Sequence, residues 1–552
     1  MAAAVTRALI MVVGLAACEA ATSPPDPLAY AEAKGSRIDN LEAAVPPMCY
    51  TQTGGASNPC WVCHTRGQGR TTLDDSSLQE SYAFSETALT NHWANLFVDR
   101  SADIARVSDD EILRWVRTDN TAPLVAAMAK MPPSYTGFRP DLDLSRGFDE
   151  LGFSRDGSGW RAVRYQPFLG AFWPTNGSTS DVFVRLPAAF RTSREQYRLN
   201  LTLVEAALSI ADYATRSIDR EIEPVDERLL GEDLDGDGSL GTATRITRLP
   251  AHYAGVPDAV VAQAYPLGAE LLHTVRYLDP DAPDRFATRL KELRYMRKVE
   301  NPDDWGRQRA YADEAEDKAD GRLPVYAGDP EVGLLGAFGW QLQGYIEDAR
   351  GALRVQTMEE HRACMGCHGN LGVTIDNTFS IARKVPGLAG WRHQDLRGLR
   401  DRPQLGHSQP ELVEYFTRVQ GGDETRSNDE LLARFFSTSG VNATADVDAK
   451  VVDAKADVGA ELVLDVRELS RASTDRDLAW AHYPSRERAL ALDKAYLAIV
   501  REQSYTRGRD AVLRPATRVH RAITVDGTGL HAEAPSANTR TYRDGRLHLD
   551  WR

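Results

Sequence analysis

The pattern of hydrophobic and polar positions along the chain indicates helices more often than strands. Apolar residues recur every three or four positions through residues 194–222, 340–368 and 487–504, which predicts three helices. Alternation is confined to short runs such as residues 181–187, which predict a short strand. Residues 138–173 mix glycines with aromatic side chains and are expected to form a long ordered loop. We therefore expect a mainly α protein with irregular loops and a few short strands.

Length and charge narrow the classes of protein to consider. A chain of 552 residues is too long for one small core, so about two to four packed units are expected. The hydrophobic fraction of 42% and the charged fraction of 26% are those of a globular protein. The formal net charge of −14 argues against nucleic-acid binding and favours partners with a basic docking surface.

The N-terminus predicts export. A short positively charged start precedes the apolar run at residues 8–17, which is long enough for a signal peptide and too short to span a bilayer. The run ends in "LAAC", which resembles the bacterial lipoprotein box, in which Cys18 becomes lipidated. The alternative is a plain signal peptide with Cys18 incidental. Because Glu19 is not the Asp that retains many lipoproteins at the inner membrane, an outer-membrane, periplasm-facing anchor is favoured. No other segment is expected to contact the membrane.

Two copies of Cys-x-x-Cys-His, at residues 60–64 and 364–368, are far more than chance provides in a chain with six cysteines. This spacing is typical of c-type haem attachment, in which two thiols bond to the haem vinyl groups and the histidine ligates the iron. A zinc ribbon would need its cysteine pairs much closer together, and a redox-active Cys-x-x-Cys does not explain the histidines. The predicted attachment residues are Cys60, Cys63, Cys364 and Cys367, with His64 and His368 as proximal iron ligands. Cys49 is left over and is expected to be buried as a small apolar side chain.

On these six motif positions the chain resembles the dihaem c-type cytochromes. The resemblance implies two cytochrome c-like haem-binding units joined by a large middle segment. The regions expected are a signal peptide at 1–17, a tether at 18–37, a first haem-binding region at 38–180, a middle region at 181–330, a second haem-binding domain at 331–440 and a mixed C-terminal region at 441–552.

The second haem needs a distal ligand from elsewhere in the chain. No methionine follows residue 365, so the downstream methionine of simple cytochromes c has no counterpart here. His361 is expected on the same side of the porphyrin as His368 and is excluded as the distal ligand. The local candidates are His393 and His407, with a distant or absent ligand as the alternative.

For the first haem, His92 and Met131 compete as distal ligands. Met131 precedes a proline pair, as in the methionine loop of simple cytochromes c, whereas His92 lies on an expected aromatic-flanked helix. Both residues could instead serve only in packing, and the sequence does not separate these possibilities.

Between the haem motifs, residues 233–244 match the start of an EF-hand calcium loop. The matching carboxylates are Asp233, Asp235 and Asp237. Thr244 stands where the bidentate glutamate should be, so a closing carboxylate would have to come from elsewhere, such as Asp212 or Glu221. We expect one calcium ion here, the alternative being an acidic turn in solvent.

Electron transfer through two covalent haems, to and from redox partner proteins, is the function favoured by the sequence. The alternative is a dihaem oxidoreductase, for which the chain also resembles the dihaem cytochrome c peroxidases. That resemblance implies one haem open to peroxide or oxygen. No catalytic residue can be assigned from the motifs. A haem-stabilised scaffold is a weaker third reading.

Overall fold

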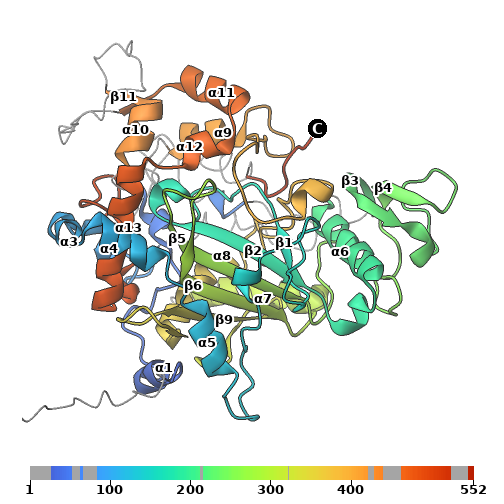
Figure 1. Ribbon diagram of the computed structural model, residues 1–552, viewed down its shortest axis with the longest axis horizontal. Helices are drawn as coiled ribbons and strands as arrows, with labels where there is room; N and C mark the ends of the chain where they lie inside the picture. The colour runs from blue at the N-terminus through green and yellow to red at the C-terminus, as the bar shows by residue number, and fades with distance from the viewer. Residues whose placement is uncertain are drawn as a thin grey trace, which may run out of the picture.

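The centre of the molecule is an antiparallel sheet of eight strands (Figure 1). The computed structural model describes residues 26–52, 62–65, 84–211, 216–320, 322–419, 428–438, 462–523 and 545–552. In sheet order the strands are β1 (Arg161–Val163), β2 (Thr179–Arg185), β5 (Glu270–Leu278), β6 (Phe286–Lys298), β9 (Trp340–Glu347), β8 (Gly333–Leu335) and β7 (Ala327–Asp329), and β10 (Leu353–Val355) also pairs with β9. The strands therefore come from residues 161–355, across three of the regions expected from the sequence.

Helices surround this sheet, and two small hairpins form separate sheets, one beside α6 and the other beside α10 (Figure 1). The helices are α1 (Ala29–Lys34), α3 (Ser101–Arg106), α4 (Asp109–Val116), α5 (Thr121–Met128), α6 (Arg194–Ser209), α7 (Asp304–Ala319), α8 (Met358–His368), α9 (Glu411–Val419), α10 (Asp429–Phe435), α11 (Val466–Asp475), α12 (Leu478–His482) and α13 (Arg486–Glu502). The hairpins pair β3 (Ser217–Asp226) with β4 (Thr242–Arg248), and β11 (Phe436–Thr438) with β12 (Leu462–Leu464).

The expected mainly α fold of two cytochrome-like units is wrong. Residues 340–368 do not form one helix. They form β9, a turn, β10 and only then α8. Residues 194–222 likewise divide into α6 and the start of β3. The error has a physical cause. In β9, polar side chains such as Gln343 and Glu347 are buried along with the apolar ones, so polar positions do not mark a solvent-facing side and the period of two is hidden. The strand expected at 181–187 and the helix expected at 487–504 are confirmed as β2 and α13.

The two faces of the sheet pack against different helices and belong to two separate apolar clusters. On one face Val182, Leu271, Met296 and Leu342 belong to the large core shared with α6 and α8. Neighbouring residues on the same strands, such as Phe183, pack on the opposite face in a cluster that includes residues of α1 and α5. Because successive side chains in a strand point to opposite faces, each strand contributes to both cores.

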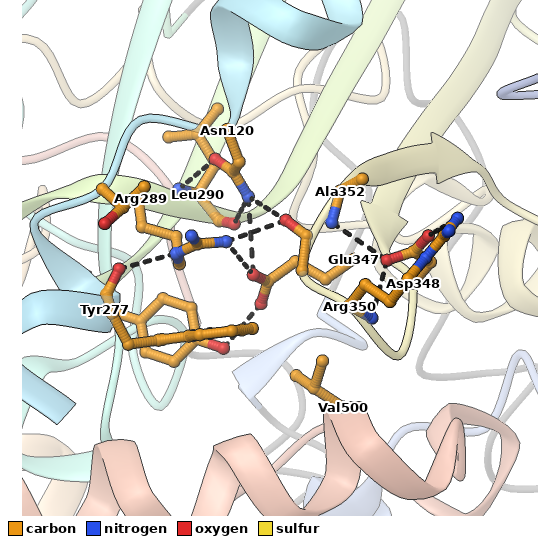
Figure 2. A network of polar contacts seen from close by, with 12 residues as sticks. Asn120, Tyr277, Arg289, Leu290, Glu347, Asp348, Arg350, Ala352 and Val500 are labelled. Atoms are coloured by element: carbon orange, nitrogen blue, oxygen red, sulfur yellow. Dashed lines mark hydrogen bonds and ion pairs between the residues drawn. The ribbon is translucent and has the colours of Figure 1, made fainter. Parts of the chain in front are cut away.

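A buried polar network ties the strands together at one end of the sheet (Figure 2). Glu347 of β9 accepts hydrogen bonds from the Tyr277 hydroxyl at 2.6 Å and from the Arg289 guanidinium at 3.0 Å. Asn120, just before α5, donates to the Leu290 carbonyl at 2.9 Å. Because these polar groups are buried, removing one partner would leave another unpaired, so the network fixes how β5, β6, β9 and α5 meet.

Candidate functional site

The second Cys-x-x-Cys-His motif forms the C-terminal end of α8. The helix begins at a capping box. The Thr357 hydroxyl accepts from the Glu360 amide at 3.2 Å, and the Glu360 carboxylate accepts from the Thr357 amide at 2.8 Å. The cap fixes the start of the helix, and positions three and four apart share a face. Cys364, Cys367 and His368 are therefore presented on the same side of α8.

These three side chains line a cavity of about 1040 Å³, including its opening to solvent, between α8 and one face of the sheet. The walls of this cavity are mainly apolar, as those of cofactor sites are. Its other walls come from the loop at 165–172, from strands β2, β5, β6 and β9, and from residues 378–380. The fold thus places two thiols and an imidazole on the wall of one apolar cavity.

His368 is held in the orientation of a metal-binding histidine. Its Nδ1 lies 2.9 Å from the carbonyl oxygen of Asn377, and that bond leaves Nε2 as the nitrogen that can ligate a metal. Asp376 and Asn377 both adopt positive φ, and the Asp376 carboxylate is anchored by Lys298 at 2.5 Å. Burial lowers the pKa of His368 to about 4, which keeps the imidazole neutral, the form that binds metals.

A second histidine, which the sequence analysis missed, lines the same cavity. His273 lies on β5, and its Nε2 is buried without a hydrogen-bond partner among the described residues. The Phe172 ring packs edge-on against it, with ring centroids 4.9 Å apart. Burial, reinforced by the nearby Arg294, lowers the pKa of His273 to about 3. The sequence pattern indicated only histidines that follow the second motif, whereas His273 precedes His368 of that motif by 95 residues and reaches the cavity from strand β5.

One cation also faces the cavity. Arg294 lines it and donates from Nε to the Glu292 carboxylate at 2.9 Å. Glu292 also accepts from Arg509 at 2.7 Å. Burial raises the pKa of Glu292, but these two guanidinium groups outweigh it and the pKa falls to about 2. Two guanidinium groups share one carboxylate, so Arg294 can offer positive charge to an anionic group in the cavity.

The first motif lies beside the second in space. Val62, Cys63 and His64 are among the described residues, and Cys60 lies outside them. The Val373 amide donates to the Cys63 carbonyl oxygen at 3.2 Å. Cys63 and Phe168 pack against the same two apolar clusters. The fold therefore brings together two motifs that the sequence separates widely.

None of the four distal-ligand candidates from the sequence lines the cavity. His92 Nε2 lies 3.0 Å from the Thr87 carbonyl oxygen, and His407 lies in the loop before α9. Met131 packs against the cluster on the opposite face of the sheet. His393 pairs with Asp181 at 3.1 Å. His361 is held by other bonds, since its Nε2 accepts from the Gly344 amide and its Nδ1 lies 2.8 Å from the Thr357 carbonyl oxygen.

The acidic loop before β4 brings together a different set of carboxylates from the one expected. Oxygens of Asp233 and Asp235 lie within 4.8 Å of each other and of the buried Glu227. Asp237 is turned to Ser239, whose amide and hydroxyl both donate to it at 2.8 Å. Of the closing carboxylates suggested by the sequence, Asp212 lies outside the described residues, and Glu221 approaches Gly387 instead. Glu227 precedes the loop, where an EF-hand pattern would not locate it.

Cys49 and Cys18 lie outside both Cys-x-x-Cys-His motifs. Cys49 is half-buried and packs against the cluster of Tyr50 and Trp93. Cys18 and the expected signal peptide and tether up to residue 25 lie outside the described residues. Within the described part of the chain, no helix has the length and apolar character needed to cross a membrane.

Comparison with known proteins identifies a family of lipoproteins. A protein family described as "-like lipoprotein" matches residues 34–530. A protein of Aquifex aeolicus (strain VF5), named "Uncharacterized lipoprotein", is 30% identical over 534 residues, covering 85% of this chain and 86% of its own. The expected membership of the c-type cytochromes, and the remote likeness to dihaem peroxidases, are therefore wrong at the level of family, because the matching family is not a cytochrome c or haem-binding one. No solved structure matches the chain.

Proposed function

The chain belongs to this lipoprotein family, and from that premise we propose that this exported, lipid-anchored protein binds two haems covalently and transfers electrons. The observation that carries the proposal is the cavity beside α8. It is lined by both thiols of a Cys-x-x-Cys-His motif and by an imidazole whose Nδ1 is already bonded. Family membership and cofactor are separate questions, because a haem motif can occur on a fold that is not a cytochrome c fold.

Four polar residues at the cavity would hold the cofactor. Cys364 and Cys367 would attach the haem, which supplies an iron that changes oxidation state. His368 would ligate the iron, and the Asn377 carbonyl fixes its ring. Arg294 faces the space with a positive charge suited to a haem propionate.

Phe168, which packs against the same two apolar clusters as Cys63, also contacts Phe379. Their ring centroids lie 4.7 Å apart, and both residues line the cavity. Cys60 and Cys63 would attach the other haem. A short, dry path between two haems is what a relay of electrons requires. The partners would be redox proteins with a basic docking surface, given the net charge of −14.

The lipid anchor sets where this relay would operate. Lipidation at Cys18 with Glu19 following favours the periplasmic face of the outer membrane over the inner membrane.

The alternative function is a dihaem oxidoreductase with one haem open to peroxide or oxygen. It requires an iron without a protein ligand on its distal side.

The test of covalent haem is direct. The full-length protein is produced in a bacterium with its cytochrome c maturation machinery, and haem is quantified after denaturation. We expect two haems per chain to remain bound. Replacing both Cys364 and Cys367 by Ala should leave one haem, whereas Cys49→Ala, outside both motifs, should leave two. A folded protein without covalent haem would overturn the proposal.

A further inference from the structure

The His273 side chain has one ring nitrogen, Nε2, to which no described residue gives a hydrogen bond. Its Nε2 is buried and has no hydrogen-bond partner among the described residues. A buried polar atom left unpaired costs about 1–3 kcal/mol, so such an atom in a native protein calls for an explanation. A ligand in the cavity that His273 lines would provide one.

The sheet holds this histidine in place. His273 pairs across the sheet with Val182 of β2 and with Arg294 of β6, and Arg294 pairs in turn with Gly344 of β9. All but Gly344 line the cavity, as does Leu271, two residues before His273 on the same face. A side chain on a central strand is positioned more rigidly than one on a loop. His273 is therefore fixed toward the cavity before any cofactor arrives.

The opposite wall of the cavity carries His368. That residue ends α8, which packs on β8 and β9 across the same face of the sheet. The two imidazoles thus enter one space from two different elements, one from the helix and one from the sheet. His368 has its Nδ1 bonded to a backbone carbonyl, and the Phe172 edge supports the ring of His273.

We propose that His273 is the distal ligand of the haem attached at Cys364 and Cys367, so that this iron is held by two histidines. This inference rests on the proposed function, since it needs the haem. It deepens that function, because an iron with both axial positions filled by protein carries electrons and has no free position for peroxide or oxygen. The oxidoreductase alternative would then have to use the other haem.

The experiment uses the full-length protein carrying Cys60→Ala and Cys63→Ala, so that only the second haem is attached. Absorbance and EPR spectra of the ferric protein are recorded with and without cyanide. We expect a low-spin haem that does not take up cyanide. Adding His273→Ala should give a high-spin haem that binds cyanide, and added imidazole should restore the low-spin spectrum.

Two further variants test this result. His407→Ala removes a histidine that the sequence suggests as a ligand and that does not line the cavity, and it should leave the spectra unchanged. His273→Met preserves a large side chain and supplies a different ligand. It should stay low-spin with a higher reduction potential, because methionine in place of histidine raises the potential.

The possible failures are distinguishable. Unchanged spectra in His273→Ala would overturn the role of His273 and leave covalent haem intact. Absence of haem from the starting protein, with the cysteines of the second motif present, would contradict the proposed function itself. If His273→Ala does not fold, a His273→Met protein with an unchanged potential would count against the proposal.

Discussion

The backbone amide of Val373 donates a hydrogen bond to the carbonyl oxygen of Cys63 over 3.2 Å. Val373 follows His368 by five positions, and Cys63 immediately precedes His64. This bond links the first Cys-x-x-Cys-His motif to the segment that follows the second, although all strands of the central sheet come from the chain between the motifs. If both motifs carry haem, the two haems are neighbours.

Neighbouring haems should interact in circular dichroism. Two strongly absorbing groups held close together couple, which splits the Soret band into a pair of opposite sign. We expect this split signal in the protein with two haems. It should collapse to a single band when Cys60 and Cys63, or Cys364 and Cys367, are replaced by Ala. A signal equal to the sum of the two single-haem variants would show that the haems are far apart.

Gly366, inside the second motif, has a packing role that a side chain would disturb. A Cβ at this position would lie 2.2 Å from the Ala44 carbonyl oxygen, too close for any real contact. Because the obstacle is backbone, Gly366→Ala should displace the segment at 44–46 and cost about 1–3 kcal/mol of unfolding free energy.

Thermal or denaturant unfolding measures this loss. Gly241→Ala is the matched control, since a Cβ there meets nothing within 4 Å. The segment at 44–46 leads toward the first motif, so Gly366→Ala should also weaken the split Soret signal. Equal stability of the two variants would contradict the packing role.

The pair of His393 and Asp181 predicts a dependence of stability on pH. Burial lowers the pKa of His393, but the carboxylate of Asp181 outweighs it, and the net pKa is raised. A raised pKa means that the paired histidine stabilises the fold fully below about pH 6.5, and this contribution is lost as pH rises through the folded pKa. Asp181, whose pKa is held far below its usual range chiefly by Arg276 against the effect of burial, stays ionised throughout.

Unfolding between pH 6 and pH 9 tests this prediction. Stability of the native protein should fall across this range, and the fall should be smaller in His393→Gln. At pH 6 the variant should lose about 1.5 kcal/mol, the lower end for a hydrogen bond to a charged group, because the His393 side chain is 32% exposed. The same pH slope in both proteins would show that another group is responsible.

The sequence predicted the wrong fold, and its prediction of haem chemistry stays a prediction. The two motifs depend on local spacing, so their residues could be named without a structure. The sheet could not be recognised because β6 and β9 bury polar side chains such as Lys291, Glu292 and Gln343 as well as apolar ones, so polarity does not alternate with burial. His273 was missed for the same reason. Its place opposite His368 follows only from the pairing of β5 with β2 and β6. Glu227 was missed because it approaches the acidic loop from outside the EF-hand spacing.

Residue 19 should control the destination of the lipoprotein. Glu19→Asp introduces the residue that retains many lipoproteins at the inner membrane. We expect membrane fractionation to find the native protein in the outer membrane and this variant in the inner membrane. Cys18→Ala should prevent lipidation and release the protein from both. Inner-membrane location of the native protein would contradict the outer-membrane assignment.

The carboxylates of Glu227, Asp233 and Asp235 should bind calcium. Three carboxylates within 4.8 Å repel one another, and burial together with neighbouring carboxylates raises the pKa of Asp235. A divalent cation would relieve this repulsion. Calcium at about one hundred times its dissociation constant should add about 2.7 kcal/mol to the free energy of unfolding.

Calorimetric titration of the calcium-depleted protein measures the affinity of this site for calcium. Glu227→Gln should weaken it, whereas Glu232→Gln, which removes an equal charge from an exposed side chain outside the group, should not. If both variants bind calcium equally, the ion is held by the loop aspartates without Glu227. If the native protein binds none, the acidic loop is only a turn, as the sequence alternative allowed.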